Sequence, residues 1–247
     1  MNILLFEQDE LNADHLLVTD HRAEHIRTVL KLKVEDTLRI GIVNGGTGQG
    51  KLICIDETGV EIKVKLDSAP PLPQEIELIL ALPRPIMLRR ILKQATVLGV
   101  RRFHLIRSAK VEKSFFQTPV LEAEKIRELL LEGLTQAVDT LLPEVLIHRR
   151  FKPFVQDVVP TLSGYGLLAH PGVTAELPEV YPKSGEKKSI LLAVGPEGGW
   201  NDFEVSNFLE QGFSAFSLGG RILHVDTAVV ALLAQLQLLR TVRRSRP

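Results

Sequence analysis

The sequence predicts an α/β protein in two units: a small β-rich unit, then a larger unit in which helices cover a mainly parallel sheet. Runs of β-branched and alternating apolar residues fill much of residues 1–70, a pattern typical of strands. Three prolines then fall within four positions, at 70, 71 and 73, and such a segment is stiff and extended. Beyond it, strand-like and helix-like runs alternate, as in a parallel sheet covered by helices. We therefore expect domains at residues 1–70 and 74–247.

The overall composition excludes several classes of protein. A chain of 247 residues with 45% hydrophobic residues can build a real core. Its formal net charge is +0, so any nucleic-acid surface must come from local segregation of charge. The single cysteine, Cys54, excludes an intramolecular disulfide and a cysteine zinc site. No basic leader opens the chain and we expect no apolar run long enough to span a bilayer, so the sequence predicts a cytoplasmic protein.

The first unit is expected to contain four strands and one helix. The strands are residues 2–6, 37–43, 51–56 and 60–66. Residues 21–32 predict a short amphipathic helix, with Ile26, Val29 and Leu30 on its apolar face. Residues 45–50, Gly-Gly-Thr-Gly-Gln-Gly, form the turn between two strands.

That glycine-rich turn imitates the beginning of a phosphate-binding loop. Gly45, Gly50 and Lys51 have the spacing of the motif, but the motif then needs Ser or Thr and a following helix. Leu52 occupies the Ser/Thr position, and the next residues favour a strand. We therefore interpret the segment as a hairpin.

The second unit alternates strands and helices throughout. The expected strands are residues 75–82, 102–107, 144–148, 166–169, 190–194 and 213–218. The expected helices are residues 87–98, 121–138, 154–162, 201–211 and 225–240. Asn201 is the expected N-cap of the fourth helix, and Glu204 completes a capping-box pattern.

Positive charge collects in two parts of the second unit. Residues 84–113 contain nine Lys and Arg residues and one acid, Glu112. Residues 148–152, His-Arg-Arg-Phe-Lys, form a second basic cluster. Such patches can neutralise phosphates without reading base identity. Alternatively, they are ordinary solvated faces, balanced by acids that lie nearby in space.

Two glycine-bearing turns near the C-terminus carry the chemistry. Residues 194–199 read Val-Gly-Pro-Glu-Gly-Gly, and residues 217–221 read Ser-Leu-Gly-Gly-Arg. Each follows a strand-like run and precedes a helix, and glycines there let a ligand approach backbone amides. With His-Pro-Gly at residues 170–172, the turns can surround one compact ligand, or they are three unrelated turns. They do not match the dinucleotide fingerprint G-x-G-x-x-G.

These motifs resemble those of the 16S ribosomal RNA uridine N3-methyltransferase family, in the knotted SPOUT class. Residues 194–199 resemble its "(I/V)GPEGG", and residues 218–228 resemble its "LGPRILRxETA". Residues 168–171 resemble "LxHP", residues 96–100 resemble "TELGV", and residues 25–32 resemble "HxxxVLR". The likeness covers nearly the whole chain, and the paired C-terminal motifs are its most specific part.

The resemblance implies a fold, a cofactor and partners. It implies a PUA-like β-barrel RNA-binding domain, then a SPOUT α/β domain with a parallel sheet and a deep trefoil knot. It implies S-adenosylmethionine as methyl donor, 16S rRNA of the 30S subunit as substrate, and a homodimer with the active site near the subunit interface. Neither a metal nor a membrane is implied, and the sequence has no cluster of metal ligands.

The resemblance also assigns candidate residues. The expected cofactor-binding residues are Leu168, His170, Pro171, Gly195, Pro196, Glu197, Gly198, Gly199, Leu218, Gly219, Ile222 and Leu223. The expected catalytic residues, near the target base, are Arg221, His224, Asp226 and Thr227. The bases expected to contact RNA are Arg22, Arg27, Lys31, Arg84, Arg89, Arg90, Lys110 and Lys113.

Three positions depart from the family pattern near the target base. Gly220 replaces a proline, His224 replaces an arginine that would be permanently charged, and Asp226 replaces a glutamate. We hypothesise that Arg221 holds a phosphate or a base carbonyl, and that Asp226, alone or through water, accepts the N3 proton. The alternatives are that Arg221 only fixes its loop and that Asp226 only caps the last helix.

Other functions remain open at this stage. One is a knotted methyltransferase that modifies a ribose 2′-hydroxyl or a different base. Another is a non-catalytic RNA-binding relative that has kept the pocket. A nucleotide hydrolase built on residues 45–51 is the most distant alternative.

Overall fold

The computed structural model describes residues 2–70, 76–182 and 189–244. The chain divides into two compact units, Met1–Pro73 with Leu131–Leu142, and Gln74–Leu130 with Pro143–Pro247. Most of the proline-rich segment, residues 71–75, lies outside the described residues. Residues 131–142 were expected in the second domain, but they pack with the first unit. Leu134, for example, shares a small buried cluster with Ile3 and Leu5.

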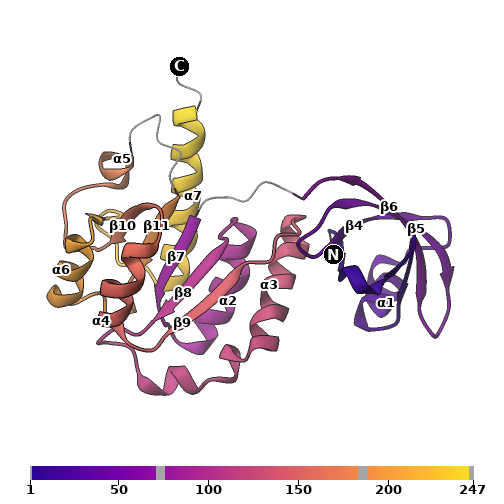
Figure 1. Ribbon diagram of the computed structural model, residues 1–247, viewed down its shortest axis with the longest axis horizontal. Helices are drawn as coiled ribbons and strands as arrows, with labels where there is room; N and C mark the ends of the chain where they lie inside the picture. Colours follow the sequence, from indigo (N-terminus) through magenta and orange to yellow (C-terminus); the bar gives the residue numbers. More distant parts are fainter. Residues whose placement is uncertain (1, 71–75, 183–188, 245–247) are drawn as a thin grey trace. The chain divides into compact units, whose positions relative to one another are not determined.

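The first unit is a six-stranded curled sheet with one short helix (Figure 1). Its strands lie in the order β1-β4-β5-β6-β3-β2. Successive side chains of a strand point to opposite faces, which explains the core of this unit. Along β6 every second residue from Val60 to Val64 is buried, and these side chains pack with Ile26 and Ile40. The strands are β1 Leu4–Phe6, β2 Leu11–Asn12, β3 His15–Val18, β4 Thr37–Ile42, β5 Thr47–Ile55 and β6 Val60–Ser68.

Two expectations about the first unit are wrong. The helix is α1 His21–His25 followed by a π-helical turn, Ile26–Leu30. The wider turn shifts the apolar face, so Ile26 is buried whereas Val29 is 63% exposed. The sequence interpretation also missed the short strands β2 and β3, which are too brief to show a period.

The expected glycine turn is also shorter than residues 45–50. β5 begins at Thr47, so the glycines at 48 and 50 lie within a strand. A Cβ on Gly48 would stand 2.0 Å from the Lys65 carbonyl oxygen, and one on Gly50 would stand 2.6 Å from Ile62. These glycines permit close strand packing, and a strand follows them, which agrees with the rejection of a phosphate-binding loop.

The second unit has a six-stranded sheet in which every pair is parallel, in the order β12-β10-β11-β7-β8-β9 (Figure 1). This confirms the predicted parallel sheet. β11 lies between β10 and β7, so the chain leaves β9, crosses to the far side and then fills the middle of the sheet. The strands are β7 Ile76–Ala81, β8 Arg102–Ile106, β9 Glu144–His148, β10 Tyr165–Ala169, β11 Ile190–Val194 and β12 Ser214–Phe216.

The connecting helices follow their local signals. α2 starts with a proline at its first position and buries Leu88, Ile91, Leu92 and Ala95 at helical spacing. Asn201 and Glu204 form the expected reciprocal capping box of α6. The helices are α2 Pro85–Val97, α3 Ala123–Ala137, α4 Phe151–Pro153, α5 Leu177–Val180, α6 Asp202–Glu210 and α7 Val225–Arg244. Phe154–Val158 continues α4 as a π-helical turn, Val159–Thr161 adds a 3-10 turn, and Lys113–Gln117 and Pro119–Leu121 are 3-10 turns before α3.

The last helix corrects one sequence expectation. By length and composition, Val225–Val242 in α7 is apolar enough to cross a bilayer, although no such run was expected. A core helix has the same composition: Val229, Leu232, Leu233 and Leu236 are buried on one face of α7, which packs against α2. On other faces Leu238 and Val242 remain exposed.

Candidate functional site

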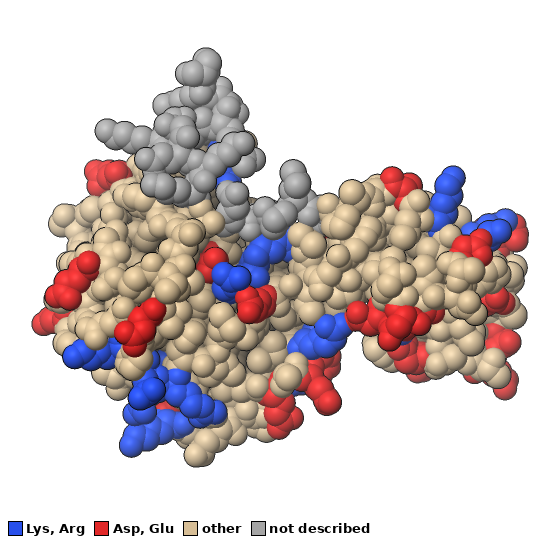
Figure 2. Space-filling model, in the orientation of Figure 1, with Lys and Arg blue, Asp and Glu red and all other residues tan. Residues whose placement is uncertain are grey.

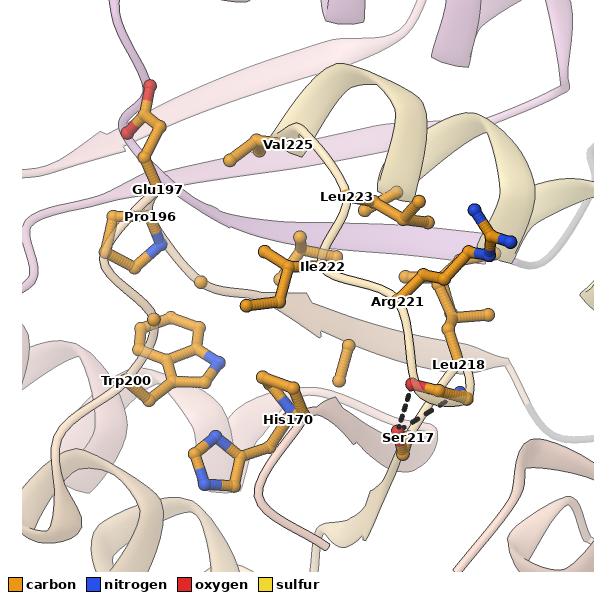
Figure 3. A pocket seen from close by; sticks show the side chains of 18 residues that line it. His170, Pro196, Glu197, Trp200, Ser217, Leu218, Arg221, Ile222, Leu223 and Val225 are labelled. Atoms are coloured by element: carbon orange, nitrogen blue, oxygen red, sulfur yellow. Dashed lines mark hydrogen bonds between the residues drawn. The ribbon is translucent and has the colours of Figure 1, made fainter.

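A pocket of about 130 Å³ opens at the carboxyl ends of β10, β11 and β12 (Figure 3). Three chain segments form its walls: the turn after β10, the glycine turn after β11, and the loop between β12 and α7. Val225, Ala228 and Leu232 on α7 close one side. Of the two alternatives that the residues alone left open, one shared ligand site or three unrelated turns, the structure shows that the three turns surround one cavity.

Most of the expected cofactor-binding residues lie in this pocket. Those in its lining are His170, Pro171, Gly195, Pro196, Glu197, Gly199, Leu218, Gly219, Ile222 and Leu223. Two expected residues are not in the lining. Leu168 is fully buried within β10, and the Gly198 carbonyl instead accepts a hydrogen bond from Lys110 Nζ at 2.6 Å.

Glycine is required at specific points of the walls. Gly199 has φ +69° and Gly219 has φ +103°, conformations that side-chain-bearing residues rarely adopt. A Cβ on Gly195 would stand 3.2 Å from the Trp200 indole. Because these glycines keep the turns tight, the backbone itself forms much of the cavity wall.

Two buried ring nitrogens in the pocket lack a partner. Trp200 is only 4% exposed, and its Nε1 makes no hydrogen bond within the described chain. His170 Nδ1 is in the same situation, and both residues line the pocket. Buried polar atoms are normally hydrogen-bonded, so these two atoms indicate a polar ligand. Trp200 was not among the expected residues, although it directly follows the glycine turn that was.

The loop after β12 gives the pocket an exposed apolar rim. Figure 3 shows the Ile222 side chain reaching toward Pro196 and Trp200, whereas the Arg221 guanidinium and the Glu197 carboxylate point outward. Ile222 is nevertheless 91% exposed. The Ser217 hydroxyl holds this loop at its start, because it accepts from the Gly219 N–H at 3.1 Å. The rim of the pocket is therefore open and apolar.

The expected catalytic residues are split between the lining and the beginning of α7. Arg221 lines the pocket, but His224, Asp226 and Thr227 do not. The Asp226 carboxylate lies 3.3 Å from the Arg90 guanidinium on α2, and it accepts the Thr227 N–H at 3.0 Å. The His224 carbonyl accepts the Ala228 N–H at 2.8 Å. Asp226 thus joins the first turn of α7 to α2, beside the pocket.

Several bases that were expected to contact RNA make intramolecular bonds. Arg22 forms ion pairs with Glu10 and Asp20 and donates to the Leu5 carbonyl. Burial is the largest single influence and raises the pKa of both carboxyls, but hydrogen bonds with Arg22, backbone N–H donors and the Arg22 charge together lower the pKa below the ordinary value. This residue holds the first unit together, and only part of its side chain faces solvent.

The other expected bases are more accessible. Arg27 donates to the Asp56 carbonyl at 2.6 Å. The backbone N–H of Arg84 donates to Glu197 at 3.3 Å, and Arg84 is an exposed residue. Among the remaining bases, Lys31, Arg89 and Lys113 are exposed. The described residues contain no group of three His, Cys, Asp or Glu side chains that could hold a metal ion.

Comparison with known proteins adds an independent result. The model of an RNA methyltransferase domain matches residues 70–237, and that of an RNA methyltransferase PUA domain matches residues 18–65. The chain is 31% identical to the ribosomal RNA small subunit methyltransferase E of Treponema pallidum, over 95% of this chain and 90% of that protein. It is 28% identical to the protein of the same name from Synechocystis, over 90% and 72%.

The fold is also similar to a solved one. The crystal structure of a ribosomal RNA small subunit methyltransferase E from Neisseria gonorrhoeae, bound to S-adenosyl methionine, matches with a TM-score of 0.77. The two chains are 20% identical, and the match covers 97% of this chain and 98% of the other. At this identity the likeness supports the fold, including the arrangement of both units' elements.

Proposed function

Because this chain belongs to the RNA methyltransferase domain family, we propose that it transfers a methyl group from S-adenosylmethionine to N3 of a uridine in 16S ribosomal RNA. Family membership confirms the resemblance stated from the motifs, and the PUA domain match confirms the PUA-like first unit. The relatives' names support an rRNA of the small ribosomal subunit as the substrate. The N3 position and the uracil base are finer proposals, which come from the resemblance.

The pocket fits S-adenosylmethionine. The single observation that carries this proposal is the pair of unpartnered buried nitrogens, Trp200 Nε1 and His170 Nδ1, within a cavity whose walls are glycine turns. A cofactor with amino, carboxylate and adenine groups offers the donors and acceptors that these nitrogens lack. When bound, it supplies an electrophilic methyl group on a sulfonium. The apolar lining from α7 excludes water from the reaction.

The residues beside the pocket supply positioning and proton transfer. Methylation of N3 requires loss of the imide proton while the nitrogen is held in line with the methyl group, and positioning provides most of the rate. Arg221, at the rim, is proposed to hold a phosphate or a base carbonyl and to stabilise the negative charge that develops on the base. Asp226, alone or through water, is the proposed acceptor of the N3 proton, and Arg90 holds its carboxylate in place.

We also propose a homodimer, a deep trefoil knot and a cytoplasmic location. Exposed apolar side chains support the dimer: Ile222 and Leu223 on the rim, and Leu238 and Val242 on α7, face solvent in a single chain. The knot is supported by the course of the chain, because the loop after β12 lines the same pocket as the turns after β10 and β11, and α7 begins directly after this loop. A second copy on this face would complete the open side of the pocket.

The decisive assay is methyl transfer to 30S subunits that lack the modification, followed by nucleoside analysis. We expect N3-methyluridine, and any other methylated nucleoside would overturn the proposed target. Asp226→Asn should lower kcat by about a hundredfold or more, as is typical for loss of a general base, with little change in cofactor affinity. Glu210→Gln is the control, because it removes an exposed carboxylate that lies outside the pocket lining. Full turnover of Asp226→Asn would remove the proton acceptor role and leave Asp226 as a structural partner of Arg90.

A further inference from the structure

A second hollow, of about 250 Å³, lies at the carboxyl ends of β8 and β9, on the same edge of the sheet as the pocket. We call it the arginine groove. The bases that line it come from two separate segments: Arg107 directly follows β8, whereas Arg149 and Arg150 directly follow β9. The register of the parallel sheet places them together, because Ile106 pairs with His148.

The groove carries an excess of positive charge. Within the described part of the chain, the Arg107 and Arg150 side chains have no acidic partner. Arg149 lies over the Phe116 ring at 5.5 Å and donates weakly to that residue's carbonyl. Figure 2 shows Lys and Arg side chains gathered on this side of the second unit, below the position of α4 in Figure 1. These features favour an anionic ligand.

The only acid in the lining is already engaged. Glu204 is almost fully buried. One of its oxygens accepts the Ala109 N–H at 2.7 Å, and the other accepts the Asn201 N–H at 3.1 Å. The Glu204 carboxylate therefore holds the loop after β8 against the start of α6, and it forms no ion pair with the arginines of the groove.

A buried hydroxyl also points to a ligand. Ser108 is 1% exposed, its Oγ lacks any hydrogen-bond partner in the described chain, and it lines the groove. A buried hydroxyl without a partner is unusual. A phosphate oxygen held by the neighbouring guanidinium groups would accept a hydrogen bond from the Ser108 hydroxyl.

Aromatic side chains give the groove a second kind of surface. Phe203 on α6 is 55% exposed, and Phe151 lies beside it with ring centroids 6.3 Å apart. An exposed ring next to bound phosphate is suited to stacking with a nucleobase. Phe151 also packs against Trp200 of the methyl-donor pocket, at 6.5 Å between centroids. The groove and the pocket therefore share a wall.

From these contacts we infer that the arginine groove binds a backbone phosphate of the RNA substrate, with the adjoining base stacked on Phe203. This inference rests on the proposed function and extends it, because it places a nucleotide that flanks the target rather than the target itself. Binding there would hold one strand of the RNA at a fixed distance from the pocket, so that a neighbouring base can reach it. Arg107 and Arg150 are thus positioning residues for the RNA.

The test compares two neighbouring bases in the full-length protein. Arg150→Ala removes a charge that lines the groove, whereas Lys152→Ala removes a charge two residues away that is also exposed but does not line it. We expect Arg150→Ala to weaken binding of single-stranded 16S rRNA fragments about tenfold, as for loss of a charged hydrogen bond. The slope of log affinity against log salt should decrease by about 1. Lys152→Ala should change affinity less than twofold.

Further measurements keep this inference separate from the proposed function. Calorimetry with S-adenosylmethionine should give the same Kd for Arg150→Ala and the native protein, while KM for RNA rises. Equal effects of Arg150→Ala and Lys152→Ala, or an unchanged salt slope, would overturn the groove even if methyl transfer is normal. Conversely, absence of methyl transfer by the native protein would refute the proposed function, while fluorescence anisotropy with RNA would still report on the groove.

Two additional arms identify the ligand and check folding. Ser108→Ala keeps the charges and should weaken RNA binding by a smaller factor, without loss of thermal stability, since its hydroxyl has no partner in the protein. Inorganic phosphate, titrated against a bound RNA fragment, should compete for the native protein more than for Arg107→Ala. If inorganic phosphate binds the groove without displacing RNA, the site is an anion site unrelated to the substrate, and the inference fails.

Discussion

The pocket at the ends of β10, β11 and β12 and the arginine groove lie on one edge of one sheet, yet they are built in opposite ways. The pocket owes its shape to the backbone: turns with glycines at 195, 199 and 219 bring the chain around the cavity, and the side chains that line it are mostly apolar. The groove owes its character to three guanidinium groups and two phenylalanine rings. A compact cofactor needs an enclosing shape, whereas a polyanionic strand needs charges at intervals.

This difference predicts different responses to mutation. A backbone-built site should be sensitive to a single added methyl group where φ is positive, and tolerant of many side-chain changes around its rim. A side-chain-built site should respond to each charge in turn, with an effect that depends on salt. Of the predictions that follow, substitution of a glycine in the pocket should have the largest effect. Removal of one ring N–H, or of one titrating histidine, should have a smaller effect.

Gly219→Ala should produce the largest effect of the substitutions in the pocket. Its φ of +103° is a conformation that alanine adopts only at a cost of about 1–3 kcal/mol. Either the loop shifts or the pocket is strained, so affinity for S-adenosylmethionine should decrease about tenfold or more, measured by calorimetry. Gly220→Ala is the matched control: it is adjacent, also has open space around an added Cβ, and has no positive φ. Equal affinities for the two variants would contradict a backbone-built wall.

Trp200→Phe should have a moderate effect. The indole N–H has no partner in the protein, so the phenylalanine variant loses no internal hydrogen bond and still packs against Phe208 and Phe151. If the N–H donates to the cofactor, affinity should fall by about fivefold, as for one neutral hydrogen bond of about 1 kcal/mol. Phe208→Leu, a core change outside the lining, controls for altered packing. Unchanged affinity would show that the cofactor leaves this nitrogen unpaired.

The same contrast explains what could be predicted from the sequence. The pocket was predictable because its turns are contiguous motifs, each following a strand. A contiguous motif can be recognised in the sequence without knowledge of the fold. Trp200 was missed as a lining residue although it directly follows one of these motifs, since the unpaired state of its N–H is visible only in three dimensions. The parallel sheet was predictable because strand-like and helix-like runs alternate along the second unit.

The groove was not predictable as a site. Residues 148–152 were visible as a basic cluster, but Arg107 joins them only through the register of β8 and β9. The same limitation applies to Arg22. From the sequence it was expected to contact RNA, but in the fold it forms ion pairs with two carboxylates. The prediction that Val29 lies on the apolar face was wrong for a local reason. The sequence periodicity assumed 3.6 residues per turn, but the helix widens to a π-helical turn there.

The smallest expected effect concerns a pair of histidines on β8 and β9, the two strands that precede the groove residues. His148 ends β9, immediately before Arg149, and its Nε2 lies 3.2 Å from His104 Nδ1. His104 Nε2 in turn lies 3.0 Å from a Glu77 oxygen. A consistent assignment has neutral His148 donating to His104, and His104 donating to the Glu77 carboxylate. Burial, and secondarily the charge that His104 can carry, lower the pKa of His148.

A lowered pKa in the folded state means that the unfolded chain binds the proton more readily. The stability that depends on neutral His148 is therefore complete above its ordinary pKa of about 6.5 and is lost as the pH falls through the folded value. We expect the unfolding midpoint to drop by about one to two degrees more between pH 7.5 and 5.5 for the native protein than for His148→Gln. Gln keeps a polar group beside His104 but does not titrate. Parallel pH profiles would show that acid destabilises the protein elsewhere, and would leave the groove wall independent of this histidine.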